Sequence, residues 1–139
     1  MPLYVLYYHA GSLSFEQKQT IAKEVTDAHC AVTGAGPYFV KVAFQACERG
    51  DFYTAGDIDQ KHVRFVGYVR RGRNPARMQE LLQRLYRSVR VGQPDETVDI
   101  EMHVQEADAD VWTLNGVNLP QPGSDEEQRW NTACGVPKQ

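Results

Sequence analysis

Hydrophobic positions along the chain follow a pattern of strand, helix and strand that occurs twice. Residues 3–9 carry aromatic and β-branched side chains on both faces, which is typical of a strand buried inside a sheet. Apolar positions at helical spacing then predict a helix over residues 14–33, with Ser14 and Gln17 forming a capping box. Residues 38–45 predict the strand that completes the first unit.

The second unit follows a polar loop. Residues 62–69 predict a strand, and Asn74 with Pro75 predicts a helix start, because proline lacks only an N–H that has no partner in the first turn. The helix carries one apolar stripe that extends to Val89. Residues 98–104 alternate between apolar and polar types, which predicts a half-buried strand.

The two halves of the chain repeat each other in architecture. A shift of about sixty residues places Ser14 over Asn74, helix over helix and strand over strand. Strand, helix and strand form a right-handed βαβ unit with parallel strands. We therefore predict one α+β (α/β) domain over residues 1–139, with pseudo-repeats at residues 2–47 and 62–106. They would form one four-stranded sheet with two helices on one face, and an oligomer would bury the other face, which is not polar.

The tail, residues 107–139, has a weaker pattern. Its prolines and the acidic run at Asp125 favour loops. Trp112, Leu119 and Trp130 predict that part of the tail packs on the body or on a neighbouring subunit, and that only the last few residues are loose.

Composition describes a soluble globular domain. The chain has 139 residues, 42% of them hydrophobic, and a net charge of -3, which disfavours a nucleic-acid binder. It has no apolar run long enough to span a bilayer and no signal-peptide pattern. Its three cysteines, odd in number and without a CxxC motif, are typical of reduced thiols, which predicts a cytoplasmic protein.

Pro2 is the first candidate for chemistry. Removal of Met1 turns Pro2 into an N-terminal secondary amine, and burial beside cations lowers the pKa of such an amine. A neutral amine can take a proton from carbon next to a carbonyl, or attack the carbonyl. If Met1 is retained, Pro2 is an amide and only begins a strand.

A basic cluster, Arg70, Arg71 and Arg73, lies between a predicted strand and a helix start. Guanidinium groups bind carboxylates or phosphates, and helix N-termini favour anions. The cluster is therefore an anion site for either ligand, or a solvated turn. His29 lies at the edge of an apolar stripe and is either a partly buried polar residue or part of the same site. No histidine pair has metal-site spacing, and the sequence has no phosphate loop, so we expect no metal and no cofactor.

Four groups of residues also occur together in one known family. They are Pro2 after the methionine, Thr26-Asp27-Ala28-His29 with Thr33-Gly34, Arg70-x-Gly72-Arg73, and Leu119-Pro120-Gln121-Pro122-Gly123 followed by Trp130. Over nearly its whole length the chain resembles the tautomerase superfamily, in the group of cis-3-chloroacrylic acid dehalogenase. The resemblance implies paired βαβ units that assemble into homotrimers, with their sheets facing a shared centre.

The resemblance also implies roles for individual residues. Pro2 would be the amine acid or base, and Arg70 and Arg73 would hold a substrate carboxylate. His29 would hydrogen-bond that carboxylate or a carbonyl oxygen. Tyr4 matches a tyrosine of the group and is included among the candidate binding residues.

Two positions depart from the dehalogenase pattern. Leu114 stands where that enzyme has a water-activating glutamate, and His103 where it has an assisting tyrosine. Leucine cannot activate water by proton transfer, so we predict a poor hydrolytic dehalogenase. His103 and Asn115 are candidates for a hydrogen bond in place of the missing groups.

The sequence thus predicts a proline-based tautomerase that interconverts the keto and enol forms of a small 2-oxo carboxylic acid. It would need neither nucleic acid nor membrane as a partner. The alternative is a catalytically silent homologue that keeps the arginine pocket as a carboxylate-binding or structural module. The physiological substrate stays open at this level.

Overall fold

The computed structural model describes residues 1–138. Its body contains β1 (Leu3–His9), α1 (Phe15–Thr33), β2 (Lys41–Cys47), β5 (His62–Arg70), α2 (Pro75–Gly92) and β6 (Asp99–Ala107). The tail contains β7 (Thr113–Leu114), β8 (Val117–Asn118) and α3 (Asp125–Ala133). Shorter elements are the 3₁₀ turns η1 (Pro37–Phe39) and η2 (Ala109–Val111) and a hairpin of β3 (Tyr53–Thr54) and β4 (Asp57–Ile58).

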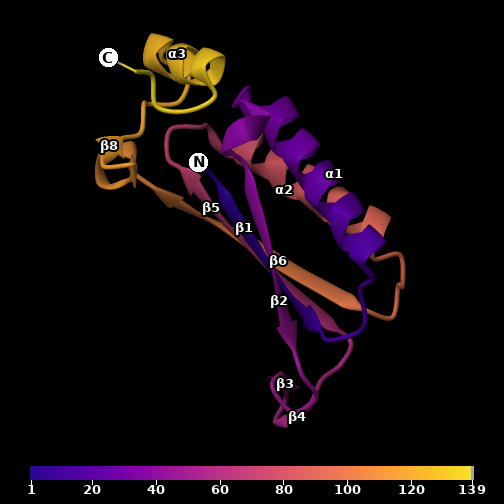
Figure 1. The fold of residues 1–139 in the computed structure, drawn as a ribbon. Coiled ribbons are helices and arrows are strands. Elements are labelled where there is room, and N and C mark those ends of the chain that lie inside the picture. The colour runs from indigo at the N-terminus through magenta and orange to yellow at the C-terminus, as the bar shows by residue number, and fades with distance from the viewer. Residues whose placement is uncertain (139) are drawn as a thin grey trace.

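The four long strands form one mixed sheet in the order β2-β1-β5-β6, with α1 and α2 on one face (Figure 1). β1 pairs with β2 and β5 with β6 in parallel, whereas β1 and β5 run antiparallel at the centre. Each parallel pair needs a crossover, which α1 and α2 provide. The predicted fold, a four-stranded sheet with two helices on one face, is confirmed.

The helix starts are set by side chains next to them in the sequence. Ser14 accepts a hydrogen bond from the Gln17 backbone at 3.1 Å, and the Gln17 side chain accepts one from the Ser14 backbone at 2.8 Å, so the predicted capping box is present. Asn74 caps α2 by accepting from the Arg77 backbone at 2.8 Å. These caps satisfy N–H groups that helix geometry leaves without partners.

The main core lies between the sheet and the two helices. β1 turns alternate residues toward it, because side chains along a strand alternate between faces. Helices α1 and α2 approach each other closely at Gly92, where a Cβ atom would lie 2.3 Å from the side chain of Ile21. The largest fully buried side chains of this core are Tyr4, Phe65, Leu6, Ile21, Leu81, Leu85, Val25 and Val63.

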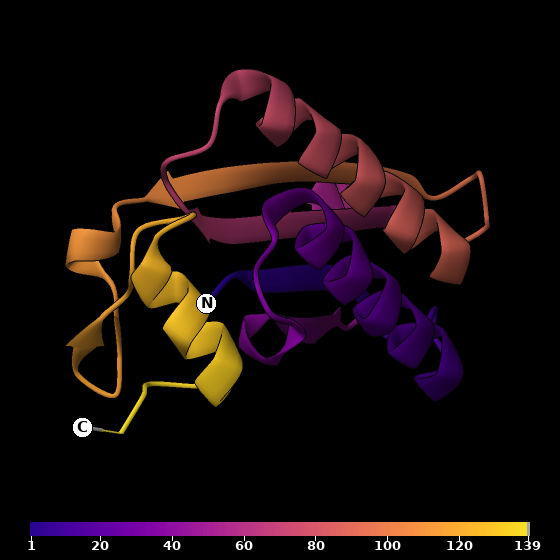
Figure 2. The same ribbon diagram turned by 90° about the horizontal axis from the view of Figure 1, so that it is seen from above.

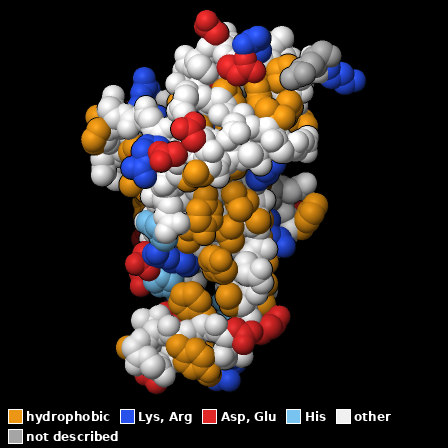
Figure 3. Space-filling model, turned by 90° about the vertical axis from the view of Figure 1, so that its left-hand side faces the viewer, with side chains coloured by type: hydrophobic (Ala, Val, Ile, Leu, Met, Phe, Trp, Pro, Cys, Tyr) orange, Lys and Arg blue, Asp and Glu red, His pale blue; other side chains and the backbone are white. Residues whose placement is uncertain are grey.

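No helix or strand of residues 1–138 covers the other face of the sheet. Figure 3 shows hydrophobic side chains gathered in a strip over this face, flanked by charged and histidine side chains. Val5, Tyr7 and Val66 on this face are half-buried, and Leu3 and Tyr68 are exposed. Exposed apolar strips of this kind often mark contact surfaces, so the oligomer remains our prediction.

The tail folds back over one end of the sheet and makes a second, smaller core. Its acidic run begins helix α3, which the sequence pattern did not predict; Ser124 caps this helix by accepting from the Glu127 backbone at 3.2 Å. α3 lies beside the N-terminus (Figure 2). The second core consists of Met1, Phe39, Ala109, Leu119 and Trp130. The prediction that part of the tail packs on the body is confirmed.

None of the helices in residues 1–138 has the length and hydropathy needed to cross a membrane.

Candidate active site

The N-terminus lies inside the protein, where β1 meets the tail. Met1 is only 7% exposed, and its amine donates a hydrogen bond to the Phe39 carbonyl. Pro2 is also buried, and its carbonyl accepts from the Lys41 backbone N–H at 3.0 Å. The position of the Pro2 nitrogen is therefore fixed by β-sheet hydrogen bonding and by burial.

The surroundings of this amine disfavour positive charge. Burial, followed by the cations of Lys41 and Arg70, lowers the pKa of the Met1 amine to about 4. Desolvation and like charge both destabilise an ammonium ion relative to the neutral amine. The Met1 amine is therefore neutral at pH 7.

His29 lies in the buried layer between α1 and β1, within electrostatic range of the N-terminal amine. The side chain is 1% exposed, and its Nδ1 lies 2.6 Å from the Tyr4 hydroxyl. Burial lowers the pKa of His29 to about 3, and the nearby Arg73 cation contributes to the shift. Burial also raises the pKa of Tyr4, so the hydroxyl keeps its proton. His29 is accordingly a neutral imidazole.

These protonation states fix the direction of the hydrogen bond between the two side chains. The protonated Tyr4 hydroxyl donates to Nδ1, so the single proton of the neutral imidazole is on Nε2. Nε2 of His29 is buried and has no hydrogen-bond partner within residues 1–138. A buried N–H without an acceptor costs about 1–3 kcal/mol, which makes it a ready donor for an oxygen atom of a ligand.

Arg70 is held by the tail rather than free. Its side chain is 3% exposed, and its two terminal nitrogens donate to the Pro120 carbonyl and to the Glu127 carboxylate. Glu127 is 5% exposed, and its other oxygen accepts from the Gly123 N–H at 3.2 Å. This buried ion pair joins the end of β5 to α3. Sequence patterns did not predict this ion pair, because its two residues are 57 positions apart along the chain.

Arg73 has more freedom than Arg70. Its guanidinium is half-buried and donates to the Arg70 backbone carbonyl at 3.0 Å. No carboxylate within residues 1–138 lies within ion-pair distance of Arg73. It lines a surface hollow of about 210 Å³ together with Thr33 and Pro122. Burial and the Arg70 cation lower the pKa of Arg73, yet a guanidinium remains charged at pH 7. Arg73 is therefore the cation of this cluster that is available to an anion.

The structure does not bring His103 and Asn115 to this group within one protomer. His103 lies in β6 between two residues that face the core, so its side chain is on the open face of the sheet, opposite from His29. Its Nδ1 lies 2.6 Å from the Arg64 guanidinium. Asn115 is exposed at the turn between β7 and β8, with φ 54, a conformation that asparagine tolerates.

Leu114, at the position where the resemblance would place a glutamate, lines the same cavity as Met1. This small cavity of about 90 Å³ lies between the N-terminus and the β7–β8 hairpin. The cavity is bordered by Met1, Lys41, Trp112, Thr113, Leu114 and Leu119. Its wall is mostly apolar, apart from Lys41 at β2 and Thr113 at β7.

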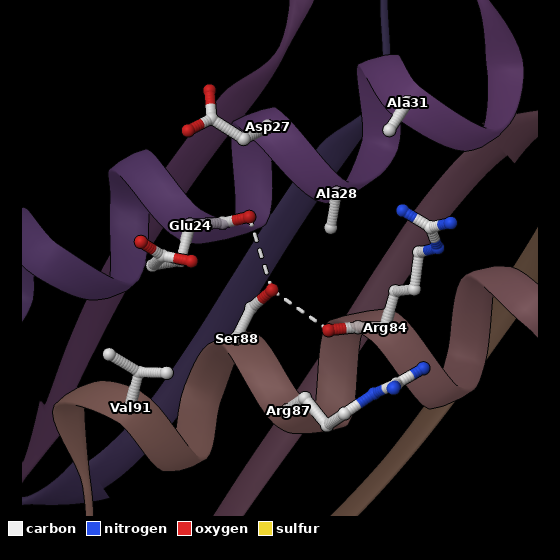
Figure 4. Close-up of a pocket in the computed structure, with 8 residues that line it drawn as sticks. All are labelled: Glu24, Asp27, Ala28, Ala31, Arg84, Arg87, Ser88 and Val91. Carbon is white, nitrogen blue, oxygen red and sulfur yellow. Dashed lines mark hydrogen bonds between the residues drawn. The ribbon is translucent and has the colours of Figure 1, made fainter.

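A second hollow lies in the groove between α1 and α2, away from the buried N-terminus (Figure 4). Ser88 crosses the groove by donating to the carbonyls of Glu24 and Arg84, at 3.1 and 2.8 Å. Acidic and basic side chains both line this groove, so it has no clear preference for a ligand of one charge.

In the part of the chain that is described, no three His, Cys, Asp or Glu side chains are placed to hold a metal ion.

The end of the sheet thus combines a buried amine position, a neutral imidazole donor and a cation. The sequence analysis proposed Pro2, His29 and Arg73 as site residues from local motifs. It missed Lys41 and Glu127, which only the fold brings close to the N-terminus. Such a site can bind a small carboxylate and transfer a proton at carbon beside a carbonyl group.

Comparison with known families gives one clear match. A family model described as "Putative oxalocrotonate tautomerase enzyme" matches residues 1–134. A comparison with curated proteins finds no match.

Several solved structures share the fold. A "probable enzyme" from the thermophilic fungus Aspergillus fumigatus is 25% identical, and the match covers 100% of this chain and 98% of that one with a TM-score of 0.86. N1, a member of the cis-3-chloroacrylic acid dehalogenase family, is 24% identical, with 95% and 97% covered and a TM-score of 0.83. A fused 4-OT, solved as an asymmetric trimer, is 14% identical, with 84% and 94% covered and a TM-score of 0.77.

Proposed function

Because this chain belongs to the tautomerase superfamily, as its motifs predicted, we propose that it interconverts the keto and enol forms of a small 2-oxo carboxylic acid. The base is the amine of Pro2 after removal of Met1. The observation that carries this proposal is the buried Nε2–H of His29, which has no partner among the described residues and lies within electrostatic range of the N-terminal amine.

The proposed reaction is a proton transfer through an enol. The Pro2 nitrogen takes a proton from C3, the C3–H electron pair forms the C2–C3 double bond, and the C2 carbonyl oxygen becomes negative. His29 donates from Nε2 to that oxygen, which stabilises the developing charge. The oxygen then takes a proton from water to give the enol, and the Pro2 ammonium releases its proton to water, which restores the neutral amine. The reverse sequence returns the ketone. No oxidant, metal or covalent intermediate is needed for this balance.

The substrate carboxylate is assigned chiefly to Arg73. Both terminal nitrogens of Arg70 already donate to the tail, so Arg70 acts mainly by holding the turn and by its positive charge. Arg73 is half-buried, where a charge-assisted hydrogen bond is stronger than in water.

Replacement of Arg73 should weaken substrate binding. Loss of a charge-assisted hydrogen bond costs about 1.5–3 kcal/mol, so kcat/KM of Arg73→Ala should fall by about 10- to 150-fold, mainly through KM. Steady-state kinetics of phenylenolpyruvate ketonisation measure this. Arg71→Ala is the matched control, since Arg71 is exposed in the same turn and paired with Asp108 at 2.9 Å. Equal effects of the two changes would contradict the assignment of Arg73.

Replacement of Tyr4 should change the tautomer of His29. Tyr4→Phe removes the donor to Nδ1, so the imidazole proton is no longer confined to Nε2, and kcat should fall by about five- to tenfold, the value of one hydrogen bond. ¹⁵N NMR of the His29 ring reports the tautomer directly. Tyr8→Phe is the control, because Tyr8 is buried on the same face of β1 and its hydroxyl contacts Lys18 instead. An unchanged His29 spectrum in Tyr4→Phe would rule out this role.

Hydrolysis of 3-chloroacrylate should be slow. Leu114 provides no general base at the position of the dehalogenase glutamate, and general base catalysis contributes about 10²–10⁴-fold. We expect chloride release, followed with a chloride electrode, to be at least a hundredfold slower than ketonisation by the same preparation. Comparable rates would show that another residue activates water.

We also propose that the protein acts as a homotrimer. The apolar strip on the open sheet face supports this, since it has no cover within residues 1–138. A structural neighbour, the fused 4-OT, was solved as a trimer. In such an assembly His103 and Arg64 on the open face would lie at or near the subunit contact.

The second candidate function is a silent carboxylate-binding module. It is favoured by one observation, the Met1 side chain, which fills the space next to Pro2. If Met1 is retained in the mature protein, Pro2 is an amide and the arginine site binds without turnover. The two candidates differ in one chemical property, the presence of a free amine at Pro2.

A further inference from the structure

We infer that the substrate carries an unbranched apolar tail at C3, and that this tail occupies the space that Met1 fills before its removal. The inference rests on the proposed function and adds a substrate class to it. It places the tail between η1, the β7–β8 hairpin and α3. Substrates with a charged tail would bind less well.

The Met1 side chain is held by apolar groups from four separate segments of the chain. It is 7% exposed and belongs to a cluster with Phe39, Ala109, Leu119 and Trp130. Trp112, Leu114 and Val136 pack against the same cluster from its edge. An aliphatic thioether chain therefore has a complete apolar site in this fold.

This site begins at the reactive atom. Met1 Cα lies two bonds from the Pro2 nitrogen, so removal of Met1 opens the space directly in front of the amine. C3 of the substrate must lie in that space, because the amine takes its proton from C3. A group attached to C3 then extends along the path of the former Met1 side chain.

The size of the site suits a chain of several atoms. A cavity of about 90 Å³ is present even beside Met1, and it is continuous with the residues that hold Met1. Leu114 forms part of its wall, so the position that lacks the glutamate of the dehalogenase pattern instead provides apolar contact.

One cation, Lys41, borders this cavity, and it raises the alternative that the substrate tail carries a carboxylate. Lys41 Nζ donates to the Phe39 carbonyl at 3.2 Å and lines the cavity. A diacid could direct its second carboxylate to this lysine. The interior contacts of Met1 are apolar, however, and a carboxylate would lose its hydration among them. A diacid is therefore the discriminating ligand.

The test measures binding and turnover separately. Trp112 and Trp130, the 2 tryptophans of the chain, both lie at this site, so tryptophan fluorescence reports its occupation. The chain without Met1 is titrated with 2-oxobutanoate, 2-oxopentanoate and 2-oxohexanoate, and with the diacid 2-oxoglutarate. We expect Kd to fall about fourfold for each added methylene, from the value of burying one CH₂. The diacid should bind more weakly than 2-oxohexanoate.

Two variants sharpen the test. Leu114→Ala removes part of the apolar wall, so each added methylene should lower Kd only about twofold. Val117 is exposed on the paired strand β8, so Val117→Ala should leave the dependence of Kd on tail length unchanged. The chain that retains Met1 should show no dependence on tail length, because its own side chain fills the site. A Kd independent of tail length in the processed chain, or tighter binding of the diacid, overturns the inference.

The proposed function is read out independently. Exchange of the C3 hydrogens for deuterium, followed by NMR in D₂O with the same acids, reports proton transfer. Tail-dependent binding without exchange supports the apolar site and contradicts the tautomerase proposal. Exchange without tail dependence supports the tautomerase proposal and contradicts the apolar site.

Discussion

Protein that retains Met1 is expected to ketonise phenylenolpyruvate about 10²–10⁴-fold more slowly than protein that begins at Pro2. This factor is the usual contribution of a general base to the rate. With Met1 present, the Pro2 nitrogen is part of an amide and has no basic lone pair. The Met1 side chain also blocks the space in front of this nitrogen, because Met1 packs into the second core and is only 7% exposed. Chemistry and access are therefore lost together.

The measurement combines intact mass with kinetics. The chain is produced with methionine aminopeptidase either co-expressed or inhibited, because a buried Met1 must be removed before the chain folds. Activity should be proportional to the fraction of molecules that lack Met1. Full activity in a preparation that retains Met1 would exclude Pro2 as the base.

A variant at Pro2 separates the base from the access effect. Pro2→Ala opens the same space but replaces the secondary amine by a primary one, so activity should fall while carboxylate binding is kept. Binding of 2-oxohexanoate, measured by tryptophan fluorescence, is the control for folding. Activity equal to that of the parent chain would contradict a specific role for proline.

The pH dependence of the processed chain follows from the same surroundings. Burial and the cations of Lys41 and Arg70, which lower the pKa of the Met1 amine to about 4, should also lower the pKa of the Pro2 amine below its ordinary value of about 8. The reaction needs the neutral amine. Consequently kcat/KM should be constant above that pKa and should decrease as the pH falls through it.

Removal of the Glu127 carboxylate should destabilise the fold strongly. Glu127→Ala leaves the Arg70 charge buried without its partner, which costs about 3–5 kcal/mol. For a domain of this size the loss corresponds to a decrease in Tm of about 10–20 °C. Thermal and urea unfolding followed by circular dichroism measure it. α3 should be the first element released, because this pair connects it to β5.

Two further variants make the result specific. Arg129→Ala removes an exposed ion pair on the same helix, where Arg129 is 72% exposed, and should cost only about 0–1 kcal/mol. The double variant Arg70→Met, Glu127→Leu removes both charges and should recover most of the stability lost in Glu127→Ala. If Glu127→Ala were no more harmful than Arg129→Ala, the buried pair would not stabilise the tail.

The sequence alone determined the four long strands and the two long helices of the body, and their order. Capping residues lie within a few positions of the helices that they start, and strand periodicity is a property of neighbouring residues. The boundaries around Ser14 and Asn74 were therefore predicted correctly, and two βαβ units allow few sheet arrangements. Pro2, His29 and Arg73 were proposed as site residues from short motifs, and their roles stay predictions.

Only the tertiary structure decided which groups surround the N-terminus. The sequence motif contains no partner for Arg70. In the fold Arg70 pairs with Glu127, which lies 57 residues later in the chain. Acidic residues at Asp125 read as a polar loop, yet Ser124 and the burial of Trp130 make them a helix. The tautomer of His29 and the apolar site of Met1 likewise depend on contacts between distant segments. Such contacts are set by packing of the whole chain, which local propensity and periodicity do not encode.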